Sequence, residues 1–121
     1  MKRNFTSLAL LVFTLVWVVQ ARSSGTTPNE PRQIVVTAKR FAYAPSEITL
    51  KKGEPVDLVL KSADVPHGLR ITELGVDLMA TKHNAAETKF TPDTTGDFTG
   101  HCSVFCGEGH GGMAITIHVT D

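Results

Sequence analysis

The chain has 121 residues and a formal net charge of zero at pH 7. This length allows a single domain, and the balanced charge argues against a nucleic-acid-binding protein. The chain has two cysteines, both within one short segment, which excludes the disulfide framework that stabilises many small exported domains.

The first 21 residues have the pattern of a targeting segment. Lys2 and Arg3 precede an apolar stretch from Phe5 to Val19, and Val19-Gln20-Ala21 offers the small residues of a cleavage site. The stretch has 15 residues, fewer than the ~20 that a membrane-spanning helix prefers. We therefore favour a cleaved signal peptide over a retained membrane anchor, and either one exports the rest of the chain. Removal of residues 1–21 leaves 10 basic and 12 acidic residues, a net charge of −2 that is compatible with a basic redox partner.

Residues 22–31 are rich in Ser, Thr, Gly and Pro and lack apolar periodicity, so they predict a flexible linker. From residue 32 to 121 the pattern favours β-strands. Apolar and polar residues alternate in short runs that are separated by turn residues. No helical pattern longer than two turns follows residue 22. We expect one all-β domain over 32–121, folded as an antiparallel sandwich, with strands near 34–38, 41–43, 48–50, 56–60, 69–71, 86–91, 98–101 and 115–119.

The segment Cys102–Met113 concentrates the metal-binding chemistry of the chain. It holds two thiols, one imidazole and one thioether within twelve residues, a soft donor set that favours copper over hard cations. A single blue-copper ion needs one thiolate from this segment and a second histidine from elsewhere. Cys102 is therefore surplus to a site with one metal, and its position four residues before Cys106 suggests that both sulfurs bridge two metals. Gly107, Gly109, Gly111 and Gly112 are expected to let the loop turn tightly around them.

The motif C-x-x-x-C-G-x-x-H-x-x-M resembles the ligand loop of the binuclear CuA centre, found in cytochrome c oxidase subunit II and in the copper domain of nitrous oxide reductase. The upstream D-x-x-H segment of that family is matched by Asp64-Val65-Pro66-His67. The resemblance covers roughly residues 34–120 and implies a cupredoxin-like Greek-key sandwich, in which the ligand loop joins the last two strands. It further implies contacts to two copper ions from His67, Cys102, the carbonyl of Val104, Cys106, His110 and Met113.

The function that this resemblance implies is one-electron transfer rather than catalysis, and the sequence has no arrangement typical of a hydrolase or a phosphate-binding enzyme. The implied partner is a redox protein such as a c-type cytochrome or an oxidase subunit, in the periplasm or on the outer face of the inner membrane. Contact with the membrane would run through residues 5–19. Two alternatives remain open. One is a periplasmic copper carrier, and the other is a redox-inactive cupredoxin-like domain in which Cys102 and Cys106 form a disulfide.

The remaining candidate residues receive structural interpretations. His83 and His101 match no ligand position of the family, and His118 is expected to point outward from the last strand. Met79 follows Leu78 and is expected to pack in the core. Asp64 either accepts a hydrogen bond beside the metal centre or belongs to an ordinary surface turn.

Overall fold

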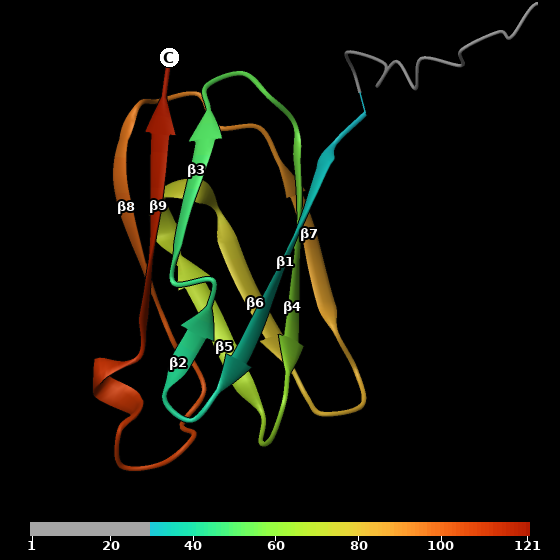
Figure 1. Ribbon diagram of the computed structural model, residues 1–121, viewed down its shortest axis with the longest axis vertical. Coiled ribbons are helices and arrows are strands. Elements are labelled where there is room, and N and C mark those ends of the chain that lie inside the picture. Colours follow the sequence, from blue (N-terminus) through green and yellow to red (C-terminus); the bar gives the residue numbers. More distant parts are fainter. Residues whose placement is uncertain (1–29) are drawn as a thin grey trace, which may run out of the picture.

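The computed structural model describes residues 30–121, which form a sandwich of two β-sheets (Figure 1). One sheet has the strand order β2-β1-β4-β7 and the other has the order β3-β9-β8-β5-β6. The predicted all-β sandwich is confirmed, whereas the predicted targeting segment and most of the predicted linker lie outside the described residues. The strands are β1 (Arg32–Lys39), β2 (Ala42–Ala44), β3 (Glu47–Lys51), β4 (Val56–Ser62), β5 (His67–Ile71), β6 (Val76–Ala80), β7 (Ala86–Phe90), β8 (Gly96–His101) and β9 (Ala114–Thr120), with 3-10 turns η1 (Thr72–Leu74) and η2 (His110–Gly112).

The alternation in the sequence corresponds to the two faces of the strands. In β9, Ile115, Ile117 and Val119 are buried, while the residues between them face outward. Since successive side chains of a strand point to opposite faces, this period of two places one apolar row of each strand between the sheets. These rows merge into one core, which includes Val36, Leu50, Leu58, Leu60, Leu69, Ile71 and Val76.

Two strand pairings are parallel, although the sequence predicted an antiparallel sandwich. Strand β1 pairs with β4 in parallel, and β3 pairs with β9 in parallel, while the other pairings are antiparallel. Between β1 and β4 the chain crosses to the second sheet to form β3 and then returns. The period of two reports which side chains face the core, but it is the same for both strand directions.

Strand β6 was not expected, and its Met79 corrects a second expectation. Val76, Leu78 and Ala80 are buried, so Met79 faces outward between Leu78 and Ala80 and is 59% exposed. Within residues 30–121, no helix has the length and apolar character needed to cross a membrane.

His118 lies on the outer face of the second sheet, as expected, and connects three strands. Its Nδ1 lies 2.5 Å from Asp97 Oδ1 on β8, and its Nε2 lies 3.4 Å from Glu47 Oε1 on β3. Hydrogen bonding to Asp97, and then to Glu47, raises the pKa of His118 above its ordinary value. When it is protonated, this imidazole forms ion pairs with both carboxylates and links the edge strand β3 to the centre of the sheet.

One end of the sandwich, the lower end in Figure 1, holds the β1–β2 hairpin, the β4–β5 connection and the long β8–β9 loop over 102–113, as well as the β6–β7 connection. The loop joins the last two strands, as the resemblance implied. The topology thus brings together residues from the first, second and last thirds of the described chain.

Candidate metal centre

His67 is the first residue of β5 and is completely buried. Its Nε2 lies 2.6 Å from Asp64 Oδ1. Its Nδ1 is also buried but has no hydrogen-bond partner among the described residues 30–121. A buried polar atom without a partner is costly, so this nitrogen fits a role as a metal ligand.

Asp64 fixes the orientation of this imidazole. Its carboxylate accepts hydrogen bonds from the backbone N–H of Arg40 at 2.9 Å and of Val65 at 2.7 Å. Desolvation raises the pKa of Asp64, but these backbone hydrogen bonds and the one from His67 outweigh it and lower the pKa to about 2. Asp64 is therefore ionised at neutral pH and favours a proton on Nε2, which leaves the Nδ1 lone pair free to bind a metal. Of the two interpretations of Asp64, the structure supports the one in which it accepts a hydrogen bond beside the candidate metal centre.

The two thiols lie close together as free, buried groups. Cys102 Sγ and Cys106 Sγ are 3.7 Å apart. A donor atom of His67 lies within 4.8 Å of both sulfurs. Cys106 is the hub of the cluster, because its sulfur also lies 3.7 Å from His110 Nδ1 and 3.9 Å from Met113 Sδ. Burial and the neighbouring Cys102 thiol raise the pKa of Cys106, against the opposing charge of Arg40.

The structure places the last predicted residue, Val104, in the same cluster and sets His110 beside an aromatic ring. The carbonyl oxygen of Val104 lies 3.0 Å from Cys102 Sγ. His110 is half-buried in the 3-10 turn η2, and its ring centroid lies 5.7 Å from that of Phe105. All six predicted residues thus meet at one end of the core. By contrast, His83 and His101 lie exposed outside the cluster.

Glycines at three positions allow these segments to pack this closely. A Cβ on Gly68 would lie 2.9 Å from the backbone nitrogen of Ser103, so a larger residue would push β5 away from the loop. Gly107 has φ +137°, a conformation that other residues rarely adopt, and a Cβ there would lie 2.9 Å from the ring of Phe41. Gly109, Gly111 and Gly112 lack a positive φ, so the expected conformational role of the loop glycines is confined to Gly107. Gly109 is needed for close packing instead, because a Cβ there would lie 2.4 Å from the ring of Phe41.

The comparison with known proteins supports the same kind of domain as the fold and the donor atoms. Residues 7–115 match the family described as the cupredoxin-like domain. The chain belongs to this cupredoxin-like family. It is 25% identical over 105 residues to cytochrome c oxidase subunit 2 of Thermus thermophilus, covering 87% of this chain and 78% of that protein. It is 31% identical over 90 residues to the nitrous-oxide reductase of Cupriavidus necator, covering 70% of this chain but only 14% of the reductase.

A solved structure shows the same cupredoxin-like fold. The periplasmic domain of subunit II of cytochrome oxidase (CoxB) of Bradyrhizobium japonicum superposes with a TM-score of 0.70 at 22% sequence identity. The superposition covers 78% of this chain and 88% of that domain.

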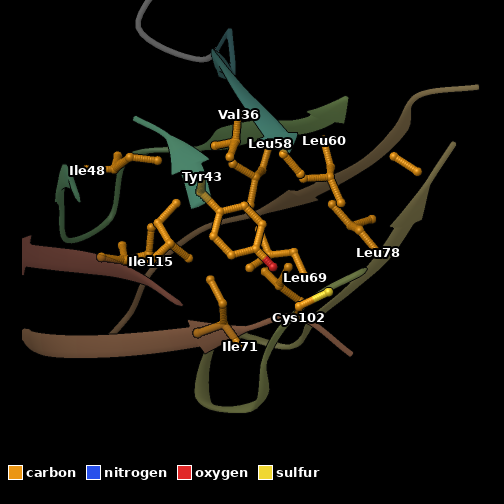
Figure 2. Packing of buried hydrophobic residues seen from close by; sticks show 14 of the residues in the cluster. Val36, Tyr43, Ile48, Leu58, Leu60, Leu69, Ile71, Leu78, Cys102 and Ile115 are labelled. Carbon is orange, nitrogen blue, oxygen red and sulfur yellow. The ribbon is translucent and has the colours of Figure 1, made fainter. Parts of the chain in front are cut away.

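Sequence reasoning missed the residues of the β1–β2 hairpin that contact the candidate metal centre. Arg40 Nε donates to the carbonyl of Cys106 at 2.9 Å. The buried hydroxyl of Tyr43 donates to the carbonyl of Gly68 at 2.5 Å and lies against Cys102 (Figure 2). Burial, and then the Cys102 thiol, raise the pKa of Tyr43, so its hydroxyl stays protonated. Arg40 is 66 positions from Cys106, and Tyr43 is 25 positions from Gly68. Neither contact could therefore be predicted from the spacing of nearby residues.

Proposed function

We propose that this cupredoxin-like chain is an exported electron-transfer protein that binds two copper ions in a CuA-type centre. His67, Cys102, Cys106, His110 and Met113 would bind through their side chains, and Val104 through its carbonyl. The donor set of two thiolates, two imidazoles and a thioether fits copper rather than a hard cation.

The observation that carries the proposal is the position of Cys102. Cys106, His67, His110 and Met113 would suffice for a mononuclear blue-copper site. Yet Cys102 is buried within the same cluster, with its sulfur 3.7 Å from that of Cys106. Two adjacent sulfurs, each within reach of other donors, support a pair of bridged metals.

A pair of copper ions would supply a one-electron couple whose charge is shared between two metals. The chain's part is to keep the donor atoms nearly fixed in both oxidation states and to exclude water. His67 and Met113 are fully buried, and Cys102 and Cys106 are 6% and 4% exposed. Asp64 holds the His67 ring at Nε2, and Gly68 lets β5 pack tightly against the loop that carries both thiols. These contacts would keep the structural change on electron transfer small.

The exposed surface near His110 is suited to the docking of a redox partner. Phe105 is 77% exposed beside the His110 ring, and Phe41, which packs against Gly107 and Gly109, is 40% exposed. An apolar surface next to a half-buried ligand suits brief docking of a c-type cytochrome or an oxidase subunit. Because the CoxB domain is described as periplasmic, we place this chain in the periplasm or on the outer face of the inner membrane.

The test is a copper titration of the reduced protein, followed by metal analysis and the visible spectrum. We expect saturation at two copper ions per chain. Cys102→Ser should convert the spectrum to that of a mononuclear site, because the remaining donors still suffice for one ion. Saturation at one ion with an unchanged spectrum in Cys102→Ser would refute the binuclear centre.

The copper-carrier alternative has one observation in its favour. A polar cleft of about 440 Å³ reaches Cys102, and Arg70, Glu73, His101 and Ser103 contribute to its lining. Such a cleft offers a surface beside Cys102 at which a second copper-binding molecule would dock. A carrier would release copper to a chelator within seconds, whereas the electron-transfer protein should retain it for hours.

A further inference from the structure

The β1–β2 hairpin touches both segments that provide the proposed copper ligands. The backbone N–H of Arg40 donates to Asp64 Oδ2 at 2.9 Å, and Asp64 in turn holds His67. The guanidinium of the same residue donates from Nε to the carbonyl of Cys106 at 2.9 Å. One residue therefore connects the His67 segment to the hub of the ligand loop.

The next residue strengthens this connection. A Cβ on Gly107 or Gly109 would lie 2.9 Å or 2.4 Å from the ring of Phe41, so the ring rests directly on the backbone of the ligand loop. Arg40 and Phe41 thus contact the loop at neighbouring positions. The guanidinium has a defined direction, because it bonds a backbone carbonyl while the ring packs beside it.

We propose that Arg40 is a positioning residue of the copper centre, which anchors the ligand loop at Cys106 and places a positive charge that raises the reduction potential. The proposal rests on the proposed function for the potential, but the anchoring concerns the chain alone. Reduction would add an electron to metals held by the two thiolates, and a nearby positive charge would stabilise that reduced state. Because Arg40 is exposed to solvent, salt should weaken its effect.

Two substitutions separate the charge from the anchor. Arg40→Gln removes both, whereas Arg40→Lys keeps a positive charge but has no donor equivalent to Nε. Arg32→Gln is the matched control, because Arg32 also donates to a backbone carbonyl, that of Thr49, from the opposite end of β1. At the rise of a β-strand, eight residues separate the two positions by roughly 26 Å.

The first measurement is the reduction potential of each copper-loaded variant at low and high salt. At low salt, Arg40→Gln should shift the reduced-to-oxidised ratio at a fixed ambient potential by about threefold to tenfold towards oxidised, where tenfold is about 59 mV. The shift should shrink at high salt, Arg40→Lys should keep most of the wild-type potential, and Arg32→Gln should keep all of it. Equal potentials in wild type and Arg40→Gln would overturn the electrostatic role.

The second measurement is amide hydrogen exchange over residues 102–113 in the copper-free protein. Loss of the anchor should speed exchange in this loop by about threefold to tenfold in both Arg40→Gln and Arg40→Lys, but not in Arg32→Gln. Unchanged exchange in both variants would overturn the positioning role. If the wild-type protein took up no copper, the proposed function would fail, while this comparison would still decide whether Arg40 anchors the loop.

Discussion

Asp64→Asn should weaken copper binding without unfolding the domain. The substitution keeps the shape of the side chain but removes the charge that accepts hydrogen bonds from His67, Arg40 and Val65. Hydrogen bonds to charged groups contribute about 1.5–3 kcal/mol, and neutral ones contribute about 0.5–1.5 kcal/mol. Since the Asp64 side chain is 34% exposed, solvent screening reduces the difference, and we expect a loss of about 1 kcal/mol. This corresponds to roughly fivefold weaker copper binding.

The assay is competition for copper between the protein and a chelator of known affinity. Asp77→Asn is the matched control, because Asp77 forms an exposed ion pair with Arg70 on the second sheet and contacts none of the proposed ligands. The control should bind copper as the wild type does. Equal copper affinities in Asp64→Asn and wild type would refute the role of Asp64 in orienting His67.

Three further predictions concern the potential, the pH dependence of stability and partner binding. Met113→Leu, a change of similar volume at a fully buried position, should keep both coppers and raise the reduction potential, because thioethers are weak axial ligands; an unchanged potential would mean that Met113 is not a ligand. Because folding raises the pKa of His118, this residue stabilises the fold fully at pH values below its ordinary pKa of about 6.5. This contribution is lost as pH rises through the folded-state pKa. The thermal midpoint should therefore fall over this range in wild type and in the control His83→Gln, and fall less in His118→Gln; equal slopes would count against the ion pairs. Phe105→Ser should weaken association with a reduced c-type cytochrome about fivefold at an unchanged potential, and unaltered electron-transfer rates would exclude Phe105 from the docking surface.

Local patterns predicted most of the strands and the composition of the cluster. The alternation around Ile115 and Ile117 corresponds directly to one buried and one exposed face of β9. The spacing of Cys106, His110 and Met113 was equally informative, because all three donors lie on one loop. His67 could be predicted only through its D-x-x-H segment, since a lone histidine carries little information.

The missed features depend on contacts between distant parts of the chain. The parallel direction of β1 and β4 follows from the crossing through β3. This crossing does not change the alternation of apolar and polar residues in either strand. Met79 was misplaced because its neighbour Leu78 occupies the inward position of β6. Arg40 belongs to a hairpin whose sequence carries no metal-binding pattern, and only the fold brings it to Cys106.

Electron paramagnetic resonance of the fully copper-loaded, oxidised protein tests the central proposal most directly. An electron shared by two copper nuclei gives a hyperfine pattern distinct from that of one copper, regardless of the partner or the pathway. We predict the shared pattern in wild type and a single-copper pattern in Cys102→Ser. A single-copper pattern in the wild-type protein, or a copper-free protein in which Cys102 and Cys106 are joined by a disulfide that reductants do not reopen for metal, would contradict the binuclear centre.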